Sequence, residues 1–232
     1  MSSGGERQIP LDLGHVAGLS RDDLVLSSAN GSAVAFIERW PDWPGPVALL
    51  AGPAGSGKSH LAAIWRGQAD ALSVTRSHIA AEIARHSQPR SYLLEDADLP
   101  GLDQQGLFHL INSVSQNRSA LLITARSFPA AWGVSLPDLA SRLKAATVIE
   151  IGEPDDDLLA GVMTKLFADR QVDVEPHVIQ FLVRRIERSL GAVNTVVQRL
   201  DRAALEQQAR ITRQLAATVL SAFDRGQDKQ LF

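Results

Sequence analysis

The chain has 232 residues, of which 45% are hydrophobic and 21% charged, with a formal net charge of -3 and no cysteine. This composition is typical of a globular protein and excludes a disulfide framework, a cysteine nucleophile and an overall basic nucleic-acid-binding surface. The N-terminus lacks a signal-peptide pattern, and no stretch approaches the roughly 18 apolar residues of a membrane span. We therefore expect a cytoplasmic protein without membrane attachment, whose contacts with DNA are local or made through a partner.

A phosphate-binding loop follows the first strand that the sequence predicts. The apolar residues 47–51 indicate a buried parallel strand, and residues 60–65 continue as a helix. Between them, glycines let backbone N–H groups turn inward around phosphates, Lys58 neutralises the outer phosphates, and the Ser59 hydroxyl can ligate Mg²⁺. A chance glycine-rich turn is the alternative. The sequence thus predicts a site for ADP or ATP with Mg²⁺, whose loop contacts are Gly52, Pro53, Ala54, Gly55, Ser56, Gly57, Lys58, Ser59 and His60.

The rest of the chain divides into an alternating part and a helical part. Short apolar runs at 71–74, 92–94, 120–123 and 147–151 alternate with helical patterns at 79–86, 104–116 and 137–145. This alternation predicts an α/β fold, a doubly wound parallel sheet of the P-loop NTPase kind. After residue 154 only helices are expected, at 155–167, 176–188, 191–208 and 212–223. The predicted organisation is a tail (1–13), an α/β base (14–152), a smaller all-α lid (153–225) and a second tail (226–232).

An acidic pair ends the predicted strand 92–94, which we expect beside the phosphate loop. In this position Glu95 is the candidate Mg²⁺ ligand and Asp96 the candidate group that orients the attacking water. An ordinary acidic strand end is the alternative. NTPases of this type usually have Asp before Glu, and the reversed order here predicts that metal binding persists while intrinsic hydrolysis is weak or absent.

Thr124 and several arginines are candidates for contacts with phosphates. Thr124, at the end of the predicted strand 120–123, could contact a γ-phosphate or be a buried threonine that bonds its own backbone. Arg142 could complete the nucleotide site of a neighbouring subunit, as an arginine finger acting in trans, or simply be solvated. Three arginines, Arg184, Arg185 and Arg188, precede the predicted helix 191–208. They could bind a phosphate or form a solvated cationic face.

Together these residues resemble the AAA+ module of the DnaA family of bacterial replication initiators, and most closely its truncated, regulatory Hda-type members. Residues 21–30 are similar to the segment that cups adenine in this family, which implies nucleotide contacts from Asp23, Leu24 and Val25. Residues 136–143 resemble the arginine-finger box, and residues 186–190 the second sensor, which implies Arg188, or alternatively Arg185. The resemblance implies an AAA+ base followed by a helical lid. Arg126 stands where the first sensor of the family is usually acidic, which weakens the case for intrinsic hydrolysis.

The two ends of the chain separate it from a full initiator. The chain stops soon after the predicted lid, which leaves no room for a basic helix-turn-helix DNA reader. Residues 8–13 (QIPLDL) resemble the peptide that binds the replicative sliding clamp, with Gln8 offering an amide and Leu11 and Leu13 filling apolar pockets. Residues 230–232 faintly echo this chemistry and are a weaker second candidate.

The expected function is negative regulation of replication initiation. In this reading the protein holds a nucleotide, which we expect to be ADP, although the sequence leaves the preference between ADP and ATP open. It binds the sliding clamp (the β subunit of DNA polymerase III) and meets DNA only through the clamp. Arg142 then stimulates hydrolysis of the ATP bound to the initiator DnaA. Two alternatives remain: an adaptor that recruits proteins without stimulating hydrolysis, and an autonomous AAA+ ATPase or loader. The oligomeric state, including a homo-oligomer, stays open.

Overall fold

A five-stranded sheet lies at the centre of the base domain. The computed structural model describes residues 20–85 and 90–227, with side chains up to residue 222. The strands β1 (Val47–Ala51), β2 (Leu72–Val74), β3 (Tyr92–Leu94), β4 (Leu121–Ala125) and β5 (Thr147–Glu150) run in the order β2-β3-β4-β1-β5. All neighbouring strands are parallel, which confirms the predicted parallel sheet. The acidic pair follows β3, which β4 separates from β1 in the sheet.

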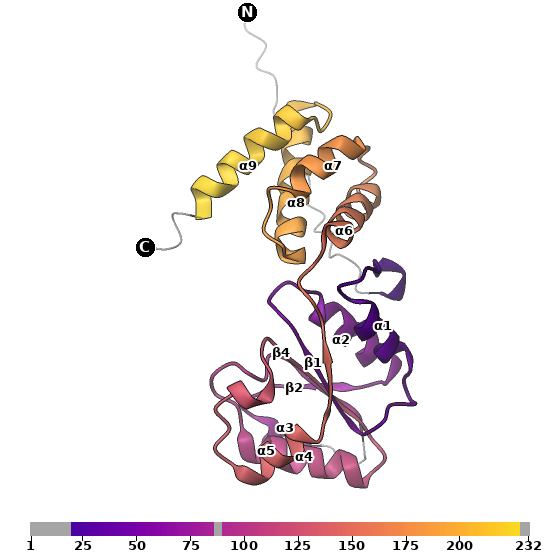
Figure 1. Cartoon of the computed structure of the whole chain (residues 1–232), viewed down its shortest axis with the longest axis vertical. Helices are drawn as coiled ribbons and strands as arrows, with labels where there is room; N and C mark the ends of the chain where they lie inside the picture. The colour runs from indigo at the N-terminus through magenta and orange to yellow at the C-terminus, as the bar shows by residue number, and fades with distance from the viewer. Residues whose placement is uncertain (1–19, 86–89, 228–232) are drawn as a thin grey trace, which may run out of the picture.

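Helices cover both faces of this sheet (Figure 1). The helices α1 (Gly31–Glu38) and α2 (Lys58–Gln68) pack on one face, and α3 (Ile79–Ile83), α4 (Gln104–Gln116) and α5 (Pro137–Lys144) on the other. Short 3₁₀ turns, η1 (Arg21–Asp23) and η2 (Pro129–Ala131), lie before α1 and after β4. In β1, Ala48 and Leu50 point into one core and Leu49 into the other. A strand buried on both faces reads as a continuous apolar run, which is why β1 was predictable.

The lid is a group of four helices at one end of the base (Figure 1). It contains α6 (Asp156–Asp169), α7 (Pro176–Val183), α8 (Leu190–Gln207) and α9 (Arg213–Gln227). These helices have an apolar core of their own, which includes Leu159, Phe167 and Leu200. Asp155 caps α6 as the sequence suggests, because its side chain accepts the Leu158 N–H at 2.8 Å. Within residues 20–85 and 90–227 no helix is long and apolar enough to cross a membrane.

Two boundaries of the lid helices differ from the prediction. Helix α7 ends at Val183 and not at residue 188, so Arg184 and Arg185 follow the end of one helix and do not begin the next. Arg185 packs over the ring of Phe181 at 4.1 Å and donates to the Phe181 carbonyl at 3.2 Å. Cations at a helix C-terminus interact favourably with the helix dipole, which explains this placement. Helix α9 continues to Gln227 and includes the first residues of the predicted tail 226–232.

Candidate functional site

The phosphate loop is a tight turn between β1 and α2. Gly55 and Gly57 have φ angles of +72° and +97°, which favour glycine at both positions. Lys58 is buried, and its Nζ donates to the carbonyls of Gly52 and Pro53, each at 2.7 Å. Burial lowers the pKa of Lys58, whereas the nearby carboxylate of Asp96 acts in the opposite direction. The loop therefore holds a partly desolvated cation that an anionic ligand would stabilise.

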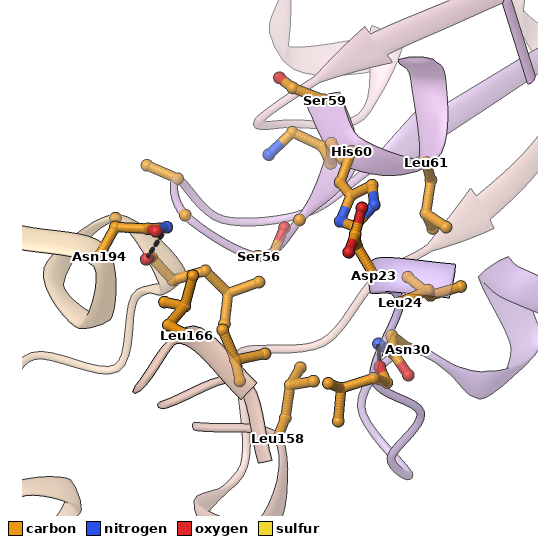
Figure 2. Close-up of a pocket in the computed structure, with 18 of the residues that line it drawn as sticks. Asp23, Leu24, Asn30, Ser56, Ser59, His60, Leu61, Leu158, Leu166 and Asn194 are labelled. Carbon is orange, nitrogen blue, oxygen red and sulfur yellow. Dashed lines mark hydrogen bonds between the residues drawn. The ribbon is translucent and has the colours of Figure 1, made fainter. Parts of the chain in front are cut away.

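A cavity of about 370 Å³ opens between this loop and the lid (Figure 2). One wall is the loop with the start of α2, a second is the segment before α1, and a third comes from α6 and α8 of the lid. The lining residues are Asp23, Leu24, Val25, Asn30, Ala54, Gly55, Ser56, Gly57, Lys58, Ser59, His60, Leu61, Asp96, Arg126, Leu158, Val162, Lys165, Leu166, Asp169, Leu190, Gly191 and Asn194.

The cavity combines apolar walls with phosphate-binding groups. Leu24, Val25 and Leu158 supply apolar surface that suits a planar ring. The Ser56 hydroxyl, in the loop, is buried and has no hydrogen-bond partner among the described residues. Such an orphaned polar atom in a glycine-rich cradle is the arrangement that a phosphate oxygen would complete.

The segment before α1 is held in shape by Asn30. This side chain is buried, accepts the Ser27 N–H at 2.9 Å and donates to the Val25 carbonyl at 2.8 Å. These two bonds close the turn that presents Leu24 and Val25 to the cavity.

Comparison with known proteins identifies both the lid and the base. The sequence model of the Hda lid domain matches residues 156–220. The whole fold is similar to domain III of the replication initiation protein DnaA from Thermotoga maritima, with a TM-score of 0.74, 16% identity, and coverage of 94% of this chain and 99% of that one.

The chain has the fold of DnaA domain III and a lid similar to the Hda lid domain. The structure of AMPPCP-bound DnaA from Aquifex aeolicus is also similar, with a TM-score of 0.65, 16% identity, and coverage of 78% of this chain and 64% of that one. An uncharacterized protein of Haemophilus influenzae is 25% identical over 226 residues, which cover 89% of this chain and 95% of that protein. The predicted fold class, an AAA+ base with a helical lid, is confirmed.

In this DnaA/Hda-like site the structure brings together most of the residues predicted to bind nucleotide. Residues 54–60, the three residues of the adenine-cupping segment and Asp96 all line the cavity. The loop residues Gly52 and Pro53 lie beneath it and bind Lys58 through their carbonyls. Neither residue is part of the cavity lining, and their contact with nucleotide stays a prediction.

The acidic pair is split by the backbone conformation at Asp96. Asp96 has a φ of +50° and donates its N–H to the Thr124 Oγ1 at 3.1 Å. As a result Asp96 lines the cavity, whereas Glu95 is exposed and outside the lining. Thr124 is buried and also outside the lining, and its hydroxyl accepts the N–H of Asp96 instead of bonding its own backbone, so its contact with a γ-phosphate stays a prediction.

The predicted lid sensor does not reach the cavity. Arg188 forms an ion pair with Asp156 at 2.8 Å and donates to the Pro154 carbonyl at 3.2 Å. Arg188 is thus held at the start of α6 by the carboxylate of Asp156. Arg185 lies over Phe181 and is also absent from the lining. Arg142 is exposed on α5 and lies outside this cavity.

Sequence reasoning missed several lining residues of the Hda-like lid and of β4. Leu158, Val162 and Leu166 recur at helical spacing along α6. This spacing predicts only a stripe packed in the core of the lid, whereas in the structure the three side chains also line the cavity. Lys165 forms an ion pair with Asp23 at 3.0 Å, and hydrogen bonds from Ser20 and Lys165 lower the pKa of Asp23 to about 2. Arg126 was noted only as a departure from the family pattern, yet it lines the cavity close to Lys58.

The residues of the site fit a metal ion that is bound mainly by the phosphates of a nucleotide. Among the described residues there is no group of three or more histidine, cysteine or acidic side chains that could hold a metal by itself. Mg²⁺ in NTPase sites is usually bound by one or two protein oxygens, water and phosphates. Ser59 and Asp96 are the cavity residues that could supply such oxygens.

Proposed function

We propose that the cavity binds ADP or ATP. Support comes from the buried Lys58, the orphaned Ser56 hydroxyl and the apolar wall formed by Leu24 and Val25. The DnaA that resembles this chain is AMPPCP-bound, which agrees with the same class of ligand. Mg²⁺, when bound, would neutralise phosphate charge, with Ser59 and Asp96 as its candidate protein ligands and Glu95 as the further acidic candidate predicted from sequence.

We propose further that this protein regulates the initiator DnaA by stimulating hydrolysis of its bound ATP. The observation that carries this proposal is the position of Arg142. It is exposed on α5, its guanidinium has no ion-pair or hydrogen-bond partner in the described part of the chain, and it does not line its own cavity. Such an arginine is available to the active site of a partner, and an arginine supplied in trans can raise hydrolysis by roughly a thousandfold or more.

Two features favour action on a partner's ATP over turnover in this chain. Asp96, the candidate for orienting water, has its N–H bonded to Thr124 Oγ1, and Thr124 lies outside the cavity lining. Arg126 adds a second cation beside Lys58 at the end of β4. Both features support weak or absent intrinsic hydrolysis, in contrast to an autonomous loader.

The proposed partners are the initiator DnaA and the sliding clamp. The lid matches the Hda lid domain, which supports a relation to DnaA. The clamp-binding peptide at residues 8–13, with Gln8, Leu11 and Leu13, lies outside the described residues and rests on the sequence alone. In this proposal DNA is reached through the clamp.

A single-turnover assay tests the role of Arg142. DnaA loaded with radiolabelled ATP is mixed with clamp on DNA and with the parent protein, Arg142→Ala, or the control Lys144→Ala from the exposed end of the same helix. We expect Arg142→Ala to keep its own nucleotide yet lose stimulation by roughly a hundredfold or more, because the lost charge acts in the transition state. Equal stimulation by Arg142→Ala and the parent would show that Arg142 is not the arginine finger. No stimulation by the parent would favour the adaptor, and turnover without DnaA would favour the loader.

A further inference from the structure

Helix α6 of the lid docks lengthwise on the segment that precedes α1. Near its start, the Asp155 Oδ2 accepts the Ser28 hydroxyl at 2.8 Å and the Ala29 N–H at 3.3 Å. Further along α6 the contacts move to Val25 and then to Asp23, so the helix and the segment run antiparallel. This segment is therefore attached to the lid along its length.

Gly161 allows the closest approach between the two. A Cβ added at Gly161 would lie 2.7 Å from the Val25 Cγ1, a distance that requires one of the two elements to shift. Gly161 lies one helical turn before Lys165, on the same face of α6. The glycine thus brings α6 near enough for the lysine to reach the segment.

Lys165 and Asp23 form the last contact. The Lys165 Nζ lies 3.0 Å from Asp23 Oδ1 and 3.6 Å from Asp169 Oδ1. The other oxygen of Asp23 accepts the Ser20 hydroxyl at 2.6 Å and the Ser20 N–H at 3.2 Å, which holds this carboxylate in place. The ammonium is already shared by two carboxylates, which argues against Lys165 as a reader of phosphate.

The same segment is tied to the phosphate-loop helix. His60, the third residue of α2, has its Nε2 3.0 Å from the Ser20 carbonyl oxygen. Asp23, His60 and Lys165 all line the cavity. The segment is therefore bonded to the wall formed by the phosphate loop and α2. Separating α6 from the segment would open the cavity on the lid side.

We propose that the Lys165–Asp23 ion pair is a latch between lid and base that sets how fast bound nucleotide leaves the cavity. The inference rests on the proposed nucleotide binding. A nucleotide in the cavity contacts both α6 and the segment before α1, which the ion pair holds together. Ligand and ion pair therefore stabilise the same closed arrangement, and each strengthens the other. Lys165 is in this sense a positioning residue of the nucleotide site.

Release of a fluorescent nucleotide measures the latch directly. The full-length protein is loaded with N-methylanthraniloyl-ADP, and the release rate is followed in stopped flow after excess ADP is added. We expect Lys165→Met to release roughly three- to tenfold faster, which is the range of a partly buried ion pair. Lys165→Arg should restore a rate near that of the parent, because arginine keeps the charge and can reach Asp23.

Three further measurements separate a latch from a general loss of structure. Glu206→Gln is the control and should leave release unchanged, because it breaks the exposed Arg202–Glu206 ion pair within the lid, outside the cavity lining. Added NaCl should speed release from the parent more than from Lys165→Met, because only the parent has the ion pair to be screened. Asp23→Asn combined with Lys165→Met should release no faster than Lys165→Met alone, because both remove the same interaction.

Gly161→Ala tests the close approach without changing any charge. We expect it to speed release, whereas Gly67→Ala, also within a helix but with nothing within 4 Å of the added Cβ, should leave release unchanged. Release at the parent rate from Lys165→Met would overturn the latch while leaving nucleotide binding intact. If the parent fails to bind the fluorescent ADP, the proposed function fails with it.

Discussion

Lys58 is a buried cation whose Nζ donates to two backbone carbonyls of the phosphate loop. Burial depresses its pKa, so the charged side chain is held at a cost in solvation until an anion binds nearby. Single residues such as Lys58 and Asp23 set the charge at opposite walls of the cavity, and their effects can be tested one at a time.

Lys58→Ala should abolish binding of both ADP and ATP, because it removes the cation that faces the outer phosphates. The apolar cores of the base do not depend on this side chain, so the melting temperature should stay close to that of the parent. Isothermal calorimetry measures the affinity, with Lys144→Ala as a control for loss of one lysine charge. Unchanged affinity for both nucleotides would contradict the assignment of the phosphate loop.

The pH dependence of stability should report the bonds of Asp23. Its pKa falls from 3.8 to about 2 in the folded protein, first through the Ser20 hydroxyl and then through Lys165. A carboxyl with a lowered pKa stabilises the fold above about pH 4, and this contribution disappears as the pH falls toward about 2. Urea unfolding at several pH values across this window should therefore show a smaller loss of stability for Asp23→Asn than for the parent. Parallel losses in the two proteins would argue against these bonds.

At the scale of elements, the site depends on where helices begin. Helix α2 starts at the phosphate loop, and α8 of the lid starts against the same loop, since the Leu190 N–H donates to the Gly55 carbonyl at 2.9 Å. Ser189 caps α8 through its side chain, which accepts the Gly191 N–H at 3.2 Å. Two helix N-termini thus border the cavity, and both favour an anionic ligand there.

Gly55→Ala should weaken nucleotide binding by separating α8 from the loop. An added Cβ would lie 2.1 Å from the Ser189 Oγ and 3.1 Å from its Cα, so the lid must move. The control is Gly133→Ala, which shares the left-handed backbone, with φ of +66°, but has open space around the added Cβ. Both variants pay a conformational cost of about 1 kcal/mol, and only Gly55→Ala should also lose affinity for ADP by calorimetry. Equal affinities would mean that the contact between lid and loop is unimportant for binding.

At the scale of the whole molecule, the proposed function assigns the nucleotide and the partners to different surfaces. The cavity lies between base and lid, Arg142 lies on α5, and the predicted clamp peptide precedes the described residues. A variant that loses nucleotide binding, stimulation of DnaA or clamp binding should therefore keep the other two, and each can be measured separately.

Replacing Gln8, Leu11 and Leu13 together with Ala should remove binding to the sliding clamp. The peptide supplies an amide and two apolar side chains, the pattern by which extended peptides bind grooves. Surface plasmon resonance on immobilised clamp measures the affinity, and ADP binding by the same variant is the control for folding. Binding as tight as that of the parent would move the search to residues 230–232.

The sequence by itself determined the sheet strands, the phosphate loop and the cap of α6. These features depend on short-range rules: β1 is buried on both faces and so reads as an apolar run, and Asp155 bonds an N–H three residues away. The resemblance of this part of the chain to a known family implied that Leu24 and Val25 lie at the nucleotide site, and both line the cavity.

The tertiary structure alone decided which polar side chains share the cavity. Glu95 and Asp96 are adjacent in sequence, yet the left-handed backbone at Asp96 leaves only one of them facing the ligand. Arg188 was expected at a phosphate but pairs with Asp156, and Lys165 was read as part of a lid helix but reaches Asp23 in the base. The physical reason is that a long charged side chain finds its counter-charge across space, and sequence spacing does not encode that distance.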